Sequence, residues 1–383
     1  MKRIYNLLSI LILSAGLMSC GPGYIKPVEA SQKDFAVSFF KHVNQDTPKG
    51  ENLVLSPYSA AVALSMLAEG AEGETRVEFD DVLGGIIYQA EDLGGNDTVI
   101  VKSANSVWVD DDFSLRNRYV SLLERDFDAF ITTQNFADPA TVKAINNWCS
   151  EHTAGKINEV IDRLEPGMVM VLANALYFNA PWENSFNAEL TSQKPFHGVS
   201  VTRNVPFMFK RSFYDYAEYH GVQMVRLPYA GGRYSMFVFL PPAGADMDAL
   251  LSEVDGDMLD ASLGLFSSRE VVLSLPKFKN ETSVLLNKPL KDMGIRTAFT
   301  QAADFSGIAE MGPLVLDQVK QKCFLELSEE GTEAAAVTVA QVRLTSARPD
   351  RTPAVMTVDR PFVFMIADSQ MEDILFAGKI VNL

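Results

Sequence analysis

The chain has 383 residues, of which 47% are hydrophobic and 21% charged, a composition that excludes an intrinsically disordered protein, a collagen and a coiled coil. Its formal net charge of −16 at pH 7 disfavours polyanionic partners, so we expect neither nucleic-acid nor heparin binding. Only three cysteines and four histidines occur, without zinc-binding or P-loop spacing, so we expect no metal site and no cofactor.

The first 30 residues have the pattern of an export signal. Lys2 and Arg3 precede an apolar run of about eleven residues, too short to cross a bilayer as a helix, and Leu17-Met18-Ser19-Cys20 follows. This pattern resembles the signal of a bacterial lipoprotein, which implies that residues 1–19 are removed and that Cys20 is acylated. An ordinary cleaved secretion signal is the alternative. We therefore expect an exported protein with a tether over 20–30 and a lipid anchor in a membrane, at the outer membrane or the cell surface.

Helical and extended segments follow one another beyond residue 30. Ser31 can cap a helix that begins there, and Ser56-Pro57 has the form of a cap and first turn for an apolar helix over 60–68. Further helices are predicted over 140–153 and 283–293. Strands are predicted where apolar and β-branched residues cluster, over 98–109, 168–178, 222–227, 234–240, 271–275 and 362–367. The order of these elements indicates one intermixed α+β domain over 31–383.

Residues 329–345 are unusually small and apolar for a loop. Alternate positions from Thr332 onward carry only small, uncharged side chains, whereas the other set is partly charged. This is the period of a β-strand with one buried face, and small residues suit a strand that slides between two strands already packed on a core. An alanine-rich helix is the alternative, because alanine is the best helix former, but Val337 and Val339 argue against it.

The start of this segment resembles the reactive-loop hinge of the serpin family, with Glu329, Glu330, Gly331, Thr332, Glu333, Ala334, Ala335 and Ala336. Further stretches resemble serpin sequence in the same order along the chain, at 52–59, 174–178, 195–197, 275–278, 294–299, 303–307, 360–364 and 376–380. The resemblance covers residues 31–383. It implies an α+β serpin fold of three β-sheets with about eight or nine helices, and an exposed reactive-centre loop at about 329–360.

The resemblance implies a function as a suicide-substrate inhibitor of serine proteases, with cysteine proteases as a further class, and not an enzyme. A protease cuts the loop and forms an acyl-enzyme, and the cut loop then inserts into the main sheet and traps the protease. We expect a monomer whose partner is an elastase-like or trypsin-like serine protease, held in a covalent complex. A non-inhibitory serpin that acts as a binding or chaperone-like protein is the alternative.

Site residues follow from the same resemblance. Family spacing places the reactive bond between Thr345 and Ser346, with Arg343 and Leu344 as alternatives. An insertion-point cluster is expected to comprise Trp182, Lys277 and Glu329, with Lys277 and Glu329 paired near Trp182; two solvated surface charges are the alternative. A sheet-opening cluster is expected to comprise Ser56, Ser59, Asn174 and Gln321, the last at a position where the family usually has a histidine.

Two expectations concern the state of the protein before cleavage. The hinge should be exposed, so that Thr332 is the first residue to turn inward only after the loop has been cut. Cys149 and Cys323 should be buried free thiols that behave as small apolar groups, and a disulfide between them is the alternative.

Overall fold

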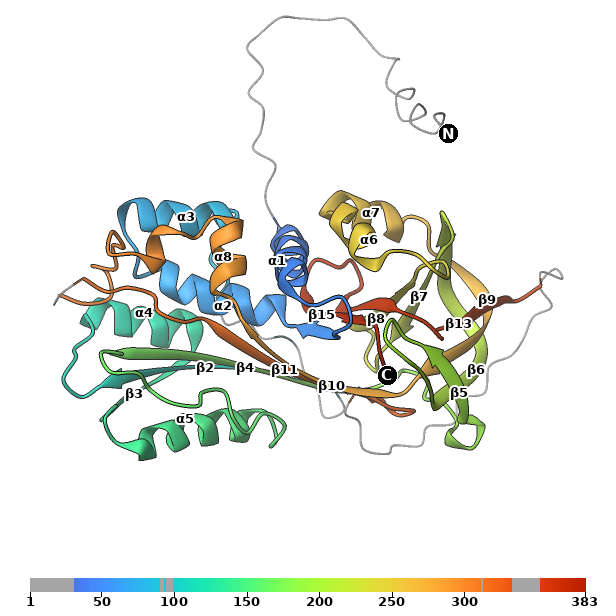
Figure 1. Ribbon diagram of the computed structural model, residues 1–383, viewed down its shortest axis with the longest axis horizontal. Coiled ribbons are helices and arrows are strands. Elements are labelled where there is room, and N and C mark those ends of the chain that lie inside the picture. The colour runs from blue at the N-terminus through green and yellow to red at the C-terminus, as the bar shows by residue number, and fades with distance from the viewer. Residues whose placement is uncertain (1–30, 90–92, 94–98, 311–312, 333–351) are drawn as a thin grey trace, which may run out of the picture.

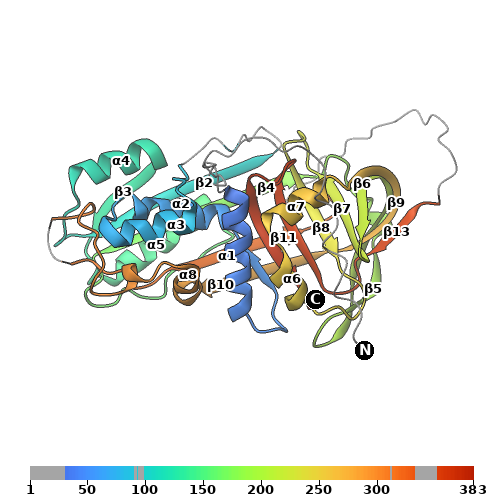
Figure 2. The same cartoon turned by 90° about the horizontal axis from the view of Figure 1, so that it is seen from above.

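The computed structural model describes residues 31–89, 93, 99–310, 313–332 and 352–383, and these residues form an elongated α+β molecule (Figures 1 and 2). Within these ranges lie eight α-helices: α1 Gln32–Asp46, α2 Pro57–Ala68, α3 Gly73–Leu83, α4 Asn117–Phe127, α5 Pro139–His152, α6 Met247–Glu253, α7 Gly256–Leu263 and α8 Asn287–Met293. Two short 3-10 turns accompany them, η1 Ala188–Leu190 and η2 Thr297–Phe299. None of the helices in the described part of the chain has the length and apolar character needed to cross a membrane.

The smaller sheet has six strands in the order β10-β11-β12-β4-β2-β3. Their bounds are β10 Phe278–Leu285, β11 Lys320–Leu327, β12 Gly331–Thr332, β4 Met170–Pro181, β2 Ile100–Asp110 and β3 Ala129–Gln134. All neighbours are antiparallel except β2 and β3, which run parallel. Helix α2 packs on one face of this sheet and α5 on the other, so β4 is covered from both sides (Figure 1).

The larger sheet has nine strands and lies at the other end of the molecule. Its strands are β1 Leu53–Leu55, β5 Ser192–His197, β6 Thr202–Tyr219, β7 Val222–Pro228, β8 Tyr234–Leu240, β9 Ser267–Pro276, β13 Ala354–Thr357, β14 Phe362–Asp368 and β15 Ile374–Ile380. Strand β6 is 18 residues long and pairs with β5 near its start and with β7 near its end. Strand β6 therefore connects the part of this sheet that contains β5 with the part that contains β7. The resemblance implies three sheets, but two of them form one hydrogen-bonded network here because they share β6.

Local sequence explains where the first two helices begin. The Ser31 hydroxyl accepts the Asp34 amide at 3.2 Å and the Asp34 side chain accepts the Ser31 amide, which is a complete capping box for α1. The Ser56 hydroxyl accepts the Ser59 amide at 3.2 Å, and Pro57 occupies the first turn of α2, where no amide donor is required. Both predicted helix starts are confirmed.

Most predicted elements lie within a few residues of the observed ones. The six predicted strands correspond to β2, β4, β7, β8, β9 and β14, and the helix predicted over 140–153 is α5. The helix predicted over 283–293 is wrong in its first turn, since α8 begins only at Asn287. Ser283 and Leu285 instead continue β10 and pair with Lys322 and Lys320 of β11, because the partner strand satisfies their backbone groups.

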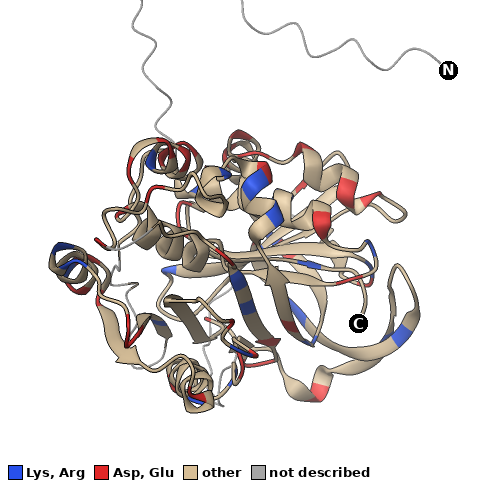
Figure 3. Cartoon of the chain, turned by 60° about the vertical axis from the view of Figure 1, so that its left-hand side comes forward, with Lys and Arg blue, Asp and Glu red and all other residues tan. Residues whose placement is uncertain are grey.

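Apolar side chains form one large core and a smaller one. The large core fills the space between the two sheets and helices α1 and α2. The smaller core holds α5 against the outer face of β2 and β4 through Trp108, Ile145, Trp148, Cys149 and Ala175. Charged residues of both signs are distributed over the helices and strands of the described part of the chain (Figure 3).

Candidate functional site

The site is built where the chain enters the six-stranded sheet between β11 and β4. Thr332 pairs with Leu327 of β11 and with Ala180 of β4, and Gly331 pairs with Pro181. Gly331 has a φ of 154°, and a Cβ at this position would overlap the carbonyl oxygen of Ala180. Glycine is therefore required at the point where the segment crosses the edge of β4.

Two stacked aromatic side chains, Tyr229 and Trp182, bind β12 and the residue just before the hinge. The Tyr229 hydroxyl lies 2.6 Å from the Thr332 hydroxyl, and the Tyr229 ring stacks on Trp182 with ring centroids 4.6 Å apart. Trp182 Nε1 donates to the Ser328 carbonyl at 3.1 Å. Burial raises the pKa of Tyr229 far above its ordinary value, against the opposing effect of the Thr332 hydrogen bond, so the hydroxyl stays protonated.

The expectation that the whole hinge is exposed before cleavage is wrong. Thr332 has no exposed surface, and Gly331 is also buried. The side chain of Thr332 is small enough to fit between β4 and β11, and Tyr229 supplies a partner for its hydroxyl, so the segment is stable in the sheet as far as residue 332. Two residues of the hinge are thus already part of the sheet.

The predicted pairing of Lys277 with Glu329 is present. Lys277 Nζ lies 2.6 Å from Glu329 Oε2, and the Thr191 hydroxyl donates to Glu329 Oε1 at 2.7 Å. The Phe186 amide donates to the Glu329 carbonyl at 2.8 Å, which fixes the backbone as well. Burial acts to raise the pKa of Glu329, but the hydrogen bonds from Lys277 and Thr191 outweigh it and the net pKa is lowered. Glu329 is therefore ionised at neutral pH and anchors the segment just before β12.

The predicted sheet-opening cluster lies around the first turn of α2, where Ser59 bonds to Asn174 and Ser56 bonds to Gln321. On the β4 side, the Ser59 hydroxyl donates to Asn174 Oδ1, and Asn174 Nδ2 donates to Asn105 Oδ1 at 2.6 Å. On the β11 side, Gln321 Nε2 donates to the Ser56 carbonyl at 2.8 Å and Gln321 Oε1 accepts the Ser56 amide at 3.1 Å. Helix α2 is thus hydrogen-bonded to the strands on both sides of β12.

Sequence reasoning missed three polar partners of the site. Asn105 is buried in β2 and donates to the Phe127 carbonyl at 2.8 Å, while Tyr229 and Thr191 contact the hinge. Asn105 could have been found from the sequence, because an amide side chain within an apolar strand indicates a buried group that needs a hydrogen-bond partner. Tyr229 and Thr191 gave no signal, because their partners lie more than 100 residues away along the chain.

A slot continues beyond β12 between β4 and β11. Within the described residues these two strands do not pair with each other: β12 bonds to both at one end, and a cavity of about 780 Å³ separates them further along. Residues 170–175 of β4 and 320–322 of β11 line it, with Leu64 of α2 on the inner side and Ile157 on the outer side. Backbone groups on the facing edges of β4 and β11 can accept a further strand.

The remaining predicted site residues lie outside the described residues: Cys20, Glu333, Ala334, Ala335, Ala336, Arg343, Leu344, Thr345 and Ser346. The two described cysteines, Cys149 and Cys323, are free and buried, as expected. Burial raises the pKa of both thiols to about 12, so neither is a nucleophile at neutral pH.

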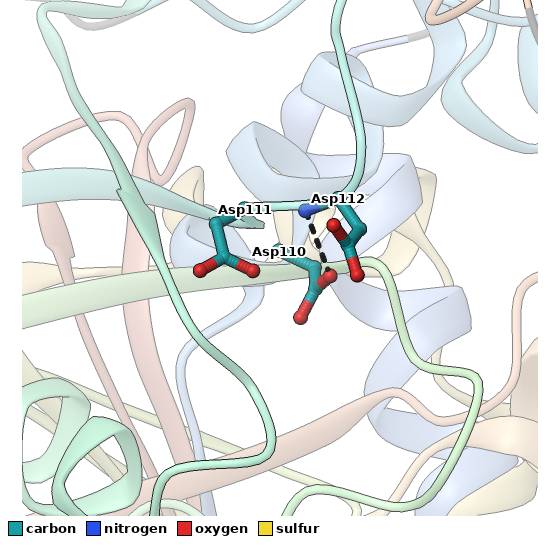
Figure 4. A group of neighbouring side chains, drawn as sticks. All are labelled: Asp110, Asp111 and Asp112. Carbon is teal, nitrogen blue, oxygen red and sulfur yellow. Dashed lines mark hydrogen bonds between the residues drawn. The ribbon is translucent and has the colours of Figure 1, made fainter.

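One group of carboxylates in the described part of the chain is close enough to be considered as a cation site. Asp110, Asp111 and Asp112 lie at the end of β2, with carboxylate oxygens within 4.8 Å of one another (Figure 4). Asp110 Oδ1 accepts the Asp112 amide at 3.1 Å, and Asp110 Oδ2 accepts the Phe136 amide at 2.9 Å. These bonds close a turn, and this structural role accounts for Asp110 without a ligand.

This architecture defines a class of protein. It is an α+β fold whose six-stranded sheet has room for one more strand between β4 and β11. A family model described as Serpin (serine protease inhibitor) matches residues 30–383. The chain therefore belongs to the serpin family, as its sequence indicates.

Individual relatives agree with this assignment. An uncharacterized serpin-like protein of Thermococcus kodakarensis is 32% identical over 94% of this chain and 87% of its own length, and Iripin-5 of Ixodes ricinus is 31% identical over 98% and 100%. The native-state crystal structure of the thermophilic serpin tengpin superposes with a TM-score of 0.83 at 29% identity, covering 92% of this chain and 93% of tengpin. Thyroxine-binding globulin complexed with thyroxine gives a TM-score of 0.80 at 25% identity, covering 92% and 98%.

Proposed function

We propose that this serpin inhibits serine proteases as a suicide substrate, by inserting its cleaved loop into the slot between β4 and β11. The observation that carries the proposal is the position of Gly331 and Thr332. These residues lead the chain into the mouth of the slot and already pair with both flanking strands. The residues that follow have small, uncharged side chains at alternate positions, as a strand passing between two packed strands requires.

The proposed reaction begins as ordinary proteolysis. The serine hydroxyl of the protease attacks the carbonyl carbon of Thr345, the proton passes to the amine of Ser346, and that amine leaves, so that an acyl ester joins Thr345 to the protease. The freed strand then pairs with β4 and β11. This pairing satisfies backbone groups on both edges of the slot and pulls the protease along the sheet before water can hydrolyse the ester.

The residues before the bond suggest the class of protease. Thr345 is a small β-branched residue that fits an elastase-like pocket, whereas Arg343 would pair with the carboxylate of a trypsin-like pocket two residues earlier. Leu344 offers a third position. We propose an elastase-like enzyme as the main partner and a trypsin-like enzyme as the second, each held in a covalent complex with a monomeric inhibitor.

We also propose that the protein is exported and held at a membrane by a lipid on Cys20. The support is the order of basic residues, short apolar run and Leu17-Met18-Ser19-Cys20. The described domain begins at Ser31, about ten residues after Cys20, which leaves a tether of up to roughly 35 Å.

The likeness to thyroxine-binding globulin in complex with thyroxine supports a second candidate function, a serpin that binds a ligand or client. The two functions are separated by incubating the protein with pancreatic elastase, trypsin and chymotrypsin. Inhibition predicts a complex that survives denaturing electrophoresis, together with a released C-terminal peptide that begins at Ser346 by mass spectrometry. Cleavage by all three proteases without any stable complex would reject the inhibitory function in favour of the binding one.

A further inference from the structure

The connection between β4 and β5, residues 182–191, holds the start of the hinge through its backbone. The Trp182 amide donates to the Glu330 carbonyl at 2.8 Å, and the Phe186 amide donates to the Glu329 carbonyl, also at 2.8 Å. We call residues 182–191 the hinge bracket. The chain passes from this bracket into the slot, so the position of the bracket determines where an inserting strand begins.

The hinge bracket lies mostly at the surface. Trp182 and Phe186 are buried, whereas residues 183–185 and 187–190 are exposed. An exposed connection is ordinarily more mobile than the strands that it joins. The peptide groups just before Phe186 therefore need a partner outside the bracket if the Phe186 amide is to keep a fixed direction.

Lys210 of β6 supplies this partner. Its ammonium donates to the Asn184 carbonyl at 2.6 Å and to the Ser185 carbonyl at 2.9 Å, and it lies 5.9 Å from the centre of the Phe186 ring. The Ser185 carbonyl and the Phe186 amide belong to one planar peptide group, in which C=O and N–H point in opposite directions. Lys210 thus holds one side of the peptide group whose other side donates to Glu329.

The surroundings of Lys210 make this contact firm. Lys210 stands opposite Leu273 of the neighbouring strand β9, within the paired part of the large sheet (Figure 1). Burial lowers the pKa of Lys210, against the opposing effect of the Glu183 carboxylate, so the ammonium is partly withdrawn from water. A charge-assisted hydrogen bond is stronger in such surroundings than in bulk water. The next residue, Arg211, instead pairs with Glu270.

We propose that Lys210 is a positioning residue for loop insertion, which orients the Ser185–Phe186 peptide group and so keeps Glu329 in place while the cleaved strand enters the slot. This inference rests on the inhibitory function proposed above. Inhibition is decided by a competition between insertion and hydrolysis of the acyl ester, so a hinge that shifts delays insertion and releases active protease. Attack on the reactive bond precedes insertion and does not depend on Lys210.

The test compares three variants of the complete mature protein by titration of pancreatic elastase. Lys210→Met removes the donors and keeps an unbranched side chain, so the number of inhibitor molecules needed per enzyme should rise roughly threefold. The rate of cleavage and the denaturation midpoint should stay as in the wild type. Lys210→Arg restores two donors and should return the stoichiometry close to that of the wild type. Arg211→Met is the matched control and should inhibit as the wild type does.

Hydrogen exchange of the uncut protein tests the contact without any protease. Peptides that cover residues 182–186 should exchange faster in Lys210→Met than in the wild type, because the Phe186 amide is no longer held in one direction. The same peptides should exchange at the wild-type rate in Arg211→Met and close to it in Lys210→Arg. A merely structural contribution of Lys210 would change the denaturation midpoint but not this local exchange alone.

The outcomes separate this inference from the proposed function. An unchanged stoichiometry in Lys210→Met overturns the positioning role, even if exchange is faster, and an equal rise in Arg211→Met overturns it as well. If the wild type forms no covalent complex, the proposed function fails, while faster exchange in Lys210→Met still supports the contact with the hinge bracket. If Lys210→Met melts early, exchange of the wild type before and after cleavage decides. The inference requires the Phe186 amide to stay protected in both states, and its loss on cleavage would overturn it.

Discussion

Replacing Thr332 with arginine should convert the inhibitor into a substrate. Thr332 has no exposed surface and lies between β4 and β11, so a guanidinium at this position must either be buried without a counter-charge or leave the sheet. Burying an unpaired charge costs several kcal/mol even after relaxation. Leaving the sheet sacrifices three paired positions of β12 and the hydroxyl bond to Tyr229, each contributing about 0.5–1.5 kcal/mol net.

The comparable size of these two costs predicts what the variant does. Before cleavage, the segment should leave the sheet, because β12 comprises only two residues and the rest of the fold can stay folded without it. After cleavage, the strand must enter the slot in order, and arginine stands at its first inward position. A barrier higher by about 1.4 kcal/mol already slows insertion tenfold, which lets hydrolysis of the acyl ester proceed first.

The assay titrates elastase with increasing inhibitor and locates the cut by mass spectrometry. Thr332→Arg should be cleaved at the wild-type bond, release active protease and need many more molecules of inhibitor per molecule of enzyme. Glu333→Arg is the matched control, since the next residue belongs to the other face of the strand and should remain in solvent. If Thr332→Arg traps protease with wild-type stoichiometry, insertion through this slot is not the mechanism.

Three further predictions address the surroundings of the hinge and the tether. Tyr229→Phe leaves the Thr332 hydroxyl buried without its partner and should lower the free energy of unfolding by about 1–2 kcal/mol in a denaturant titration, whereas an unchanged midpoint would mean that the bond contributes nothing. Because the pKa of Glu329 is lowered in the fold, its contribution to the free energy of unfolding should be constant at neutral pH and should be lost as the pH falls below the ordinary value of 4.5. Lys277→Ala should make this loss of stability smaller, because Lys277 stabilises the ionised form of Glu329. A variant with the same pH dependence as the wild type would contradict the assignment. Cys20→Ala should move the protein from the membrane fraction to the soluble one or leave it unprocessed, and wild-type partitioning into membranes would exclude the lipid anchor.

Much of the fold could be predicted because its strands are locally distinctive. Strands such as β8 and β14 are short, rich in β-branched or aromatic residues and bounded by turns, so pattern alone finds them. The first turn of the helix expected at 283 failed because Ser283 and Leu285 fit either period, and only pairing with β11, more than 30 residues away, decides for strand.

The candidate site, like the fold, could be predicted from the sequence only in part. The resemblance identified Lys277 with Glu329 as a pair, and the structure joins them. Burial of Thr332 could not be foreseen, because an alternating pattern says that a segment is able to enter a sheet but not how far it has entered. That distance depends on Tyr229, just after β7, and on the room beside Ala180 of β4, both remote from the hinge in sequence.

The two paired residues of β12 change the kinetics expected of the proposed insertion. Forming a new strand in a sheet ordinarily requires a nucleation step, in which the ends of a flexible chain must be brought together before any pairing compensates for the lost entropy. Here Gly331 and Thr332 already form that nucleus in the uncut protein. Once the chain is cut, pairing can propagate from Thr332 one residue at a time, as a zipper closes from an engaged end. The rate of trapping should then be governed by how fast β4 and β11 accept each successive residue, and not by the search for the slot.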